Sequence, residues 1–163
     1  MPLNGEVRTR FVADAMLGSL CRKLRALGFD TSYYKAGSDS GMIEAALAQK
    51  RIILTSDRSL AALASSKGLG AILLAGKSDE ERISAMSRAA AASGTRLVRG
   101  DPLCSLCGCE LATLRRIDVS DEVPLAVISH HRVFYRCRGC GHLYWRGSHW
   151  KKLSSLSRRL EPK

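Results

Sequence analysis

Two short cysteine pairs stand out in the C-terminal part of the sequence. Cys104 and Cys107 enclose two residues in "CSLC", and Cys137 and Cys140 do the same in "CRGC", with 29 residues between the pairs. Each pair can place two thiolates on a tight turn, and two such turns complete a closed tetrahedral site for Zn²⁺. Four protein ligands leave no open position for a reacting water. The spacing therefore predicts a structural zinc ribbon, in preference to free thiols or a redox pair.

Two further cysteines need separate explanations. Cys109 lies two residues past the first pair and could replace a ligand, but the repeated spacing indicates that it is a spare thiol. Cys21 lies among apolar residues of a predicted helix, where a small buried hydrophobic side chain is expected. A cysteine-rich chain that binds metal fits a reducing compartment, where structural disulfides are disfavoured.

Three aspartates follow the ends of predicted strands. Asp14 follows the run "RFVA", Asp39 comes after "DTSYY" at the entry to a predicted helix, and Asp57 follows "RIILT". In a parallel α/β sheet, ligands bind beyond the C-terminal ends of the strands. Carboxylates gathered there would repel one another unless a hard cation such as Mg²⁺ or Mn²⁺ lay between them. Such a cation can polarise a phosphodiester and lower the pKa of an attacking water, which is nuclease chemistry.

Each aspartate also has a purely structural explanation. Asp57 and Asp39 stand where a helix N-cap is expected, and a capping carboxylate accepts hydrogen bonds from the first amides of the helix. Asp14 could belong to a turn. A single aspartate is better explained as a cap. Three aspartates that follow strands at one sheet edge are explained equally well by caps and by a metal site.

Two alternating periodicities in residues 10–100 predict β-α units on a parallel sheet. Strands are expected at 10–13, 30–34, 51–55, 70–75 and, as an edge strand, 95–98, and helices at 16–29, 38–50, 57–68 and 77–94. The composition shifts at "RGDP" (99–102), which predicts a domain boundary. Alternating stretches at 111–119 and 131–137 are expected to be strands of the ribbon.

Positive charge is concentrated near the C-terminus. The chain carries a net charge of +11, with 15 basic and 9 acidic residues in 1–100, 2 and 5 in 101–129, and 9 and 1 in 130–163. The segment "GHLYWRGSHWKKL" (141–153) adds aromatic residues next to Arg146, Lys151 and Lys152, as in surfaces that bind nucleic acids. The alternatives are a solvated basic surface and aromatic residues that pack the ribbon onto the first domain.

The hydropathy pattern points to a soluble cytoplasmic protein. No apolar run approaches the roughly 20 residues that a membrane helix needs. The N-terminal segment "MPLNGEVRTR" has no apolar stretch of the kind that secretion signals carry. We therefore expect no membrane partner.

Three quoted segments together resemble the Mut-seven C-terminal RNase domain family. They are "FVADAMLGSLCRKLRALGFDTSYY" (11–34), "DSGMIEAALAQKRIILTSDRSL" (39–60) and "CSLCGCEL…CRGCGHLYWRGSHW" (104–150). The resemblance implies a PIN-like α/β/α fold with a mainly parallel sheet, an appended zinc ribbon and metal-dependent ribonuclease activity. It matches Asp14, Asp39 and Asp57 to the acids of the family, and Cys104, Cys107, Cys137 and Cys140 to its zinc ligands.

The sequence departs from the family pattern at two places. Cys21, Arg22 and Lys23 stand where an Ala-Arg-Trp run is expected, and Ser56 stands where an arginine is expected before the third acid. Arg22 and Arg25 lie about one turn apart on a predicted helix and, with Arg58, could bind the substrate backbone. Exposed helix charges without a ligand are the alternative.

These observations predict a PIN-like three-layer α/β/α domain at 1–100, a small β-rich Cys₄ zinc ribbon at 101–150 and a basic tail at 151–163. The expected function is an endoribonuclease in which Asp14, Asp39 and Asp57 hold Mg²⁺ or Mn²⁺, while the ribbon and tail bind RNA. The alternative is a non-catalytic RNA-binding protein, acting near tRNA or ribosomes, with a vestigial acidic site. No fourth acid of the kind common in such nucleases can be assigned from the sequence.

Overall fold

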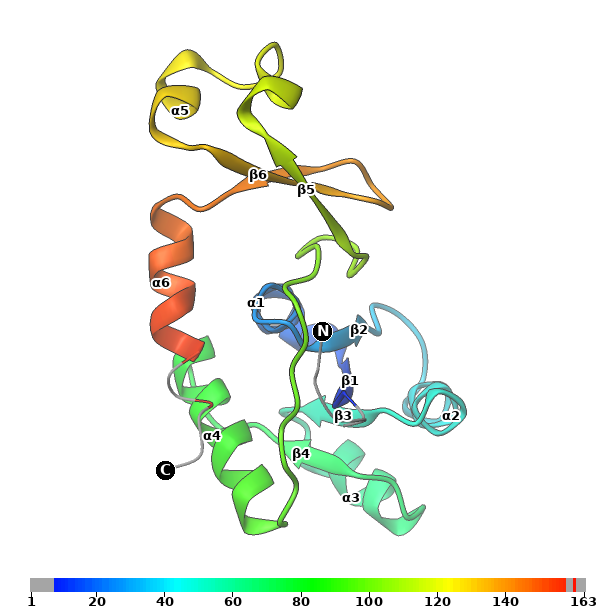
Figure 1. Cartoon of the computed structure of the whole chain (residues 1–163). Helices are drawn as coiled ribbons and strands as arrows, with labels where there is room; N and C mark the ends of the chain where they lie inside the picture. Colours follow the sequence, from blue (N-terminus) through cyan, green and yellow to red (C-terminus); the bar gives the residue numbers. More distant parts are fainter. Residues whose placement is uncertain (1–7, 158–159, 161–163) are drawn as a thin grey trace.

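A four-stranded parallel sheet forms the centre of the N-terminal domain (Figure 1). The computed structural model describes residues 8–157 and 160, except for the side chains of residues 148, 149, 151 and 152. The strands lie in the order β2-β1-β3-β4. Their bounds are β1 (Arg10–Ala13), β2 (Asp30–Tyr33), β3 (Ile52–Thr55) and β4 (Ala71–Leu73). This arrangement confirms the predicted parallel α/β architecture.

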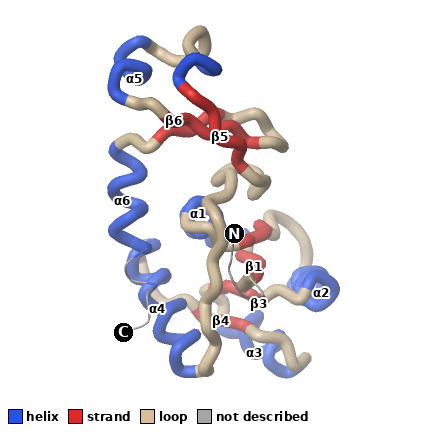
Figure 2. The backbone as a smooth tube through the Cα atoms, in the orientation of Figure 1, coloured by secondary structure: helices blue, strands red, loops and turns tan. Residues whose placement is uncertain are grey.

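Helices connect these strands and cover both faces of the sheet (Figure 2). They are η1 (Ala15–Leu17), α1 (Gly18–Ala26), α2 (Asp39–Gln49), α3 (Arg58–Ser66) and α4 (Asp79–Ala92). Side-chain caps explain where several begin, because a cap oxygen satisfies an amide that has no partner inside the helix. Ser38 Oγ accepts from the Gly41 amide at 3.2 Å and Ser78 Oγ from the Glu81 amide at 3.2 Å.

Alternation along the strands divides the core into two layers. Phe11 and Leu54 pack on the face covered by α1 and α4, whereas Val12 and Ile53 pack on the face covered by α2 and α3. Successive strand residues point to opposite faces, so short apolar strands supply both layers. The result is the predicted three-layer α/β/α domain.

The segment after α4 differs from the prediction. Residues 95–98 form no strand; the Thr9 amide donates to the Val98 carbonyl at 2.9 Å, but the contact does not extend into a ladder. The chain then passes close to the end of α1, where the Gly100 amide donates to the Gly28 carbonyl at 2.8 Å. These hydrogen bonds hold the linker, the segment between α4 and the ribbon, against the first domain.

The zinc ribbon contains a three-stranded antiparallel sheet. Its strands are β5 (Leu111–Arg115), β6 (Val133–Cys137) and β7 (Leu143–Trp145), in that order. Between β5 and β6 lie η2 (Arg116–Val119) and α5 (Leu125–His130). Phe134 is fully buried, and with Val119 and Val123 it forms a separate small core. The two predicted strands are confirmed in part: residues 111–115 and 133–137 are strands, whereas residues 116–119, predicted to continue the first strand, form η2. The sequence did not predict α5 or β7.

Part of the predicted C-terminal tail packs on the first domain. Helix α6 (Ser148–Ser157) leaves the ribbon and runs back to the first domain (Figure 1). Leu156 and Leu160 are buried in the core beneath α1 and α4. Residues 151–157, predicted to be part of a basic tail, are therefore mostly helix that joins the two domains. Across the described residues, no helix is long and apolar enough to span a membrane.

Candidate functional site

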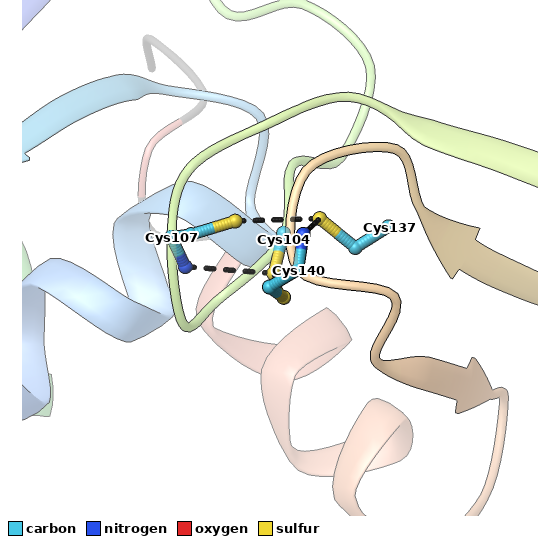
Figure 3. A group of neighbouring side chains, drawn as sticks. All are labelled: Cys104, Cys107, Cys137 and Cys140. Carbon is cyan, nitrogen blue, oxygen red and sulfur yellow. Dashed lines mark hydrogen bonds between the residues drawn. The ribbon is translucent and has the colours of Figure 1, made fainter.

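The four cysteines of the two pairs converge on one point (Figure 3). Their Sγ atoms all lie within 4.8 Å of one another, with Cys104 Sγ 3.6 Å from Cys140 Sγ and Cys107 Sγ 3.3 Å from Cys137 Sγ. One pair comes from the loop before β5, and the other from the last residue of β6 and the turn that follows it. Four sulfur atoms at this spacing fit a tetrahedral ion such as Zn²⁺.

The electrostatics of the cluster also favour a cation. Burial opposes ionisation of Cys104, but hydrogen bonds from Tyr144 and Cys107 outweigh it and lower the pKa of this thiol to about 6. At Cys140 the His142 amide favours the thiolate, but desolvation and the neighbouring sulfurs prevail and raise its pKa to about 12. Thiolates this close repel one another, and a positive ion between them would offset that repulsion.

Cys109 lies beside the cluster without belonging to it. It is exposed and is not among the four converging sulfurs, as expected for a spare thiol. We call the turns at 104–107 and 137–140 the first and second zinc knuckles. A Cβ at Gly139, in the second knuckle, would lie 2.6 Å from Cys109 Sγ, so the glycine leaves room for the Cys109 side chain. Cys21 is buried in the main core, as its sequence context predicted.

Arg25 connects the first knuckle to the first domain. It is buried, and its Nε donates to the Thr31 carbonyl at 2.7 Å. Its Nη1 donates to the carbonyls of Leu106 at 2.8 Å and Ser105 at 3.3 Å, inside the first knuckle. This corrects both expectations for Arg25, because a guanidinium used in this way is neither an exposed charge nor available to a phosphate.

Asp14 and Asp57 lie at the carboxyl edge of the sheet, at the ends of β1 and β3. Connections from these adjacent strands lead to opposite faces, so this is the switch point at which such folds bind ligands. Asp14 is buried, accepting the Met16 amide at 2.9 Å on Oδ1 and the Thr55 hydroxyl on Oδ2. The Thr55 hydroxyl also accepts the Asp57 amide at 2.9 Å. One hydroxyl therefore joins the two acidic residues.

Asp39 reaches the same edge from α2. Asp14 and Asp39 both line a cleft of about 200 Å³, together with Lys35 and Leu60. Asp39 is the exposed first residue of α2, and Ser38 rather than Asp39 caps the helix. The cap explanation for Asp39 is thus wrong, and its carboxylate is left beside the cleft.

Asp57 does act as a helix cap. Its Oδ1 accepts the amides of Ser59 at 2.6 Å and Leu60 at 3.3 Å. Among the described residues, only the cysteine cluster brings three or more ligand side chains together closely enough to share an ion. The three aspartates therefore occupy one edge, but their carboxylates are not gathered around a single point.

The predicted substrate-binding cations lie in different places. Arg22 and Arg146 are exposed and line a second cleft, of about 830 Å³, between α1, the linker, the ribbon sheet and α6. Arg58 is exposed at the start of α3, directly after Asp57. Lys151 and Lys152 belong to α6, but their side chains lie outside the described part of the structure.

Comparison with known families shows to which protein family the chain belongs. The chain matches the Mut7-C RNAse domain over residues 9–157, which spans both the α/β domain and the ribbon. It belongs to the Mut7-C RNAse domain family. Searches of curated proteins and of solved structures gave no match. Membership of the Mut7-C family indicates a nuclease of the hydrolase class, with RNA as the implied substrate.

Three residues near the sites were not singled out from the sequence. Thr55 connects Asp14 to Asp57, and the only sequence signal for it is its position two residues before an aspartate. Lys35 places an exposed cation at the cleft of Asp14. Asp79, the first residue of α4, is buried and pairs with Lys23 Nζ at 2.9 Å.

Proposed function

We propose that this Mut7-C domain is a metal-dependent endoribonuclease whose active site is the cleft at the carboxyl edge of the parallel sheet. The observation that carries the proposal is the placement of Asp14 and Asp39 in one cleft, at the switch point of the sheet, in a chain of the Mut7-C family. Asp57 lies at the end of the neighbouring strand. The position of these acids supports a site for Mg²⁺ or Mn²⁺.

A small number of carboxylates suits Mg²⁺, which is seldom bound by protein atoms alone. Mg²⁺ keeps several of its waters and is commonly bound through one or two carboxylates plus substrate phosphates. Asp14 and Asp39 would supply the carboxylates. Asp57, whose Oδ1 caps α3, would contact the ion's waters through its other oxygen. A catalytic Mg²⁺ would therefore not require the three carboxylates to lie close enough to bind it together.

The residues of the chain have distinct tasks in this proposal. Thr55 and the Met16 amide hold the Asp14 carboxylate in one orientation. Lys35 brings a positive charge to the same cleft, where it would meet a scissile phosphate, and Arg58 would hold a neighbouring one. When bound, the divalent ion would polarise the phosphodiester and lower the pKa of the attacking water.

The zinc ribbon has a structural task. Four thiolates would complete the coordination of Zn²⁺ and leave no position open for substrate. We infer that zinc supports the ribbon and, through it, the RNA-binding surface. Its proposed ligands are Cys104, Cys107, Cys137 and Cys140, as the sequence predicts.

Cleavage of RNA by the zinc-loaded protein in Mn²⁺ tests this proposal. We expect single-stranded RNA to be cut in Mn²⁺ or Mg²⁺, and the rate to fall about a hundredfold or more in Asp14→Asn and Asp39→Asn. Glu44→Gln is the matched control, because Glu44 lies exposed on α2 but does not line the cleft. Equal cleavage by wild type and Asp14→Asn would exclude this site.

The alternative function is RNA binding without cleavage. It is favoured by one observation, that the three carboxylates are not gathered closely enough to bind one ion together. In that case the protein would bind RNA with a strong dependence on salt but cut none in any divalent metal. The cleavage assay separates the two functions directly.

A further inference from the structure

We propose that the cleft between α1 and the zinc ribbon binds an unpaired nucleotide of RNA, with its base among the aromatic side chains of the ribbon and α6. This proposal rests on the proposed function only in taking RNA as the substrate. It assigns a second site, separate from the acidic cleft, and it predicts a preference for single-stranded RNA. The cleft encloses about 830 Å³, within the range of pockets that hold small organic ligands.

The ribbon sheet provides an aromatic wall. Thr113, Tyr135 and Tyr144 are paired across β5, β6 and β7, so their side chains form one row on one face of the sheet, and all three line the cleft. Phe134, the residue before Tyr135 in β6, points to the other face and fills the core of the ribbon. Tyr135 is only half-buried. The Tyr144 hydroxyl lies 3.1 Å from Cys104 Sγ and 3.2 Å from Ser105 Oγ. Tyr135 is therefore the ring of this row that the ribbon does not use solely for packing.

A cation lies between two of the aromatic rings. The guanidinium carbon of Arg146 lies 5.7 Å from the centre of the Tyr135 ring and 5.1 Å from that of Trp150, which belongs to α6. Flat aromatic and guanidinium groups are the usual stacking partners of unpaired bases. Arg146 can also meet a phosphate, because it is exposed.

The opposite wall comes from the first domain and carries both signs of charge. Arg22 is exposed on α1, while Lys23 beside it is bound to Asp79. Glu80 and Asp101 also line the cleft. Carboxylates repel phosphates but accept hydrogen bonds from amino groups of bases, so they favour a base inside the cleft and its phosphate near Arg22 or Arg146.

The geometry of the cleft argues against duplex RNA. In a duplex the bases are stacked and paired, and a pocket of this kind reaches them only when a strand is open. Helix α1 begins beside Asp14 and carries Arg22 one turn after Gly18, its first residue. A strand leaving the cleft along α1 would therefore pass toward the acidic edge. The cleft would anchor single-stranded RNA next to the site of cleavage.

Binding measurements on a protein that does not cleave test the inference. Asp14→Asn, loaded with zinc and kept free of Mg²⁺ and Mn²⁺, is titrated against a fluorescein-labelled single-stranded 12-mer and against the blunt duplex of the same sequence. We expect the single strand to bind at least about tenfold more tightly. Adding Tyr135→Leu should weaken single-strand binding roughly five- to a hundredfold, the range for loss of one aromatic stacking partner.

Two controls isolate the ring of Tyr135. Tyr135→Phe keeps the ring and should bind as before, and so should Val133→Ala, which changes an exposed residue of the same strand outside the cleft. A single strand containing 2-aminopurine should lose fluorescence when it binds the Asp14→Asn protein, because a stacked base is quenched. Equal affinity for duplex and single strand, unchanged binding by Tyr135→Leu, or unchanged 2-aminopurine fluorescence would each overturn the inference.

The failure of the nuclease proposal gives a different result. If wild type cuts no RNA in Mn²⁺ but the single strand still binds and quenches as expected, the cleft assignment stands and the proposed activity falls. If RNA is cut but the aromatic variant binds normally, the activity stands and the cleft assignment falls.

Discussion

Arg25 joins the α/β domain to the zinc ribbon, and replacing it with methionine tests how strongly the stability of each depends on the other. Methionine keeps an unbranched aliphatic side chain but removes the guanidinium. The variant loses two short hydrogen bonds, at 2.7 and 2.8 Å, and a longer one at 3.3 Å. It leaves the carbonyls of Thr31, Ser105 and Leu106 without this donor.

The expected cost follows from the kind of hydrogen bond lost. Bonds from charged donors contribute about 1.5–3 kcal/mol each, and the two short ones dominate. Part of this is offset, because the variant no longer has to bury a charge. The free energy of unfolding should therefore fall by about 2–4 kcal/mol, a large share of a typical total of about 5–15 kcal/mol. For a chain of this length the melting temperature should fall by roughly 5–15 °C.

Denaturant unfolding of the zinc-loaded protein measures the loss, and a colorimetric chelator measures how fast zinc leaves. Zinc should leave faster from Arg25→Met than from wild type, because two of the lost bonds hold the first knuckle. Arg22→Met makes the same change at an exposed position of the same helix and should alter stability by no more than about 0.5 kcal/mol. The reasoning is refuted if Arg25→Met is as stable as Arg22→Met and releases zinc at the wild-type rate.

Three further predictions concern the acidic edge of the sheet and the packing of the fold. Thr55→Val should slow RNA cleavage about 10- to 100-fold while Thr55→Ser retains activity, because the hydroxyl orients Asp14; equal rates in all three proteins would contradict this. Burial opposes ionisation of Asp79, but hydrogen bonds from Lys23, Ser19 and Arg82 outweigh it and lower its pKa. This carboxylate stabilises the fold above about pH 4 and ceases to do so as the pH falls through its folded-state pKa. The stability advantage of wild type over Asp79→Asn, measured by denaturant unfolding, should therefore shrink between about pH 6 and pH 3, and a constant difference would count against it. Gly28 has a φ of +93°, and a Cβ there would lie 2.1 Å from the Gly100 carbonyl oxygen, whereas Gly68, at a φ of +72°, has no atom within 4 Å. Gly68→Ala should lower the free energy of unfolding by about 1 kcal/mol, and Gly28→Ala by about 1–3 kcal/mol more. Thermal unfolding of both variants measures this, and a Gly28→Ala protein as stable as Gly68→Ala would contradict it.

The elements of the α/β domain could be predicted because their signals are local. Apolar runs of four or five residues indicated the strands, and helical stripes with capping residues indicated the helices. Repeated cysteine spacing was equally informative, since each pair lies on one tight turn. These predictions depend on residues close together in the chain, and all four core strands were confirmed.

Contacts between segments far apart in the chain could not be predicted from the sequence. The charged residues of 151–163 predict a basic tail, whereas the packing role of Leu156 and Leu160 is visible only in the assembled core. Residues 95–98 are predicted to extend the sheet, yet their backbone bonds to residue 9 form no ladder, and the Thr95 amide donates to the Ala90 carbonyl at 2.9 Å. Buried charges such as Arg25 and Asp79 look like surface residues until their distant partners are known.

The acidic edge was predicted in part. Strand ends placed Asp14 and Asp57 correctly, because parallel strands bring their carboxyl ends to one edge. Asp39 reaches the cleft through the loop after β2, which no periodicity describes. The distance between carboxylates depends on side-chain rotamers and on helix capping at Asp57, neither of which the sequence specifies.

Cleavage of a circular single-stranded RNA is the most direct test of the proposed function. A circle has no ends, so only an endonuclease can open it. The zinc-loaded protein should convert the circle to linear and shorter products in Mn²⁺, and Asp14→Asn should leave it intact while still binding it. A circle that stays intact with wild type in both Mn²⁺ and Mg²⁺, or one that Asp14→Asn opens at the wild-type rate, would contradict a metal-dependent endoribonuclease at this edge of the sheet.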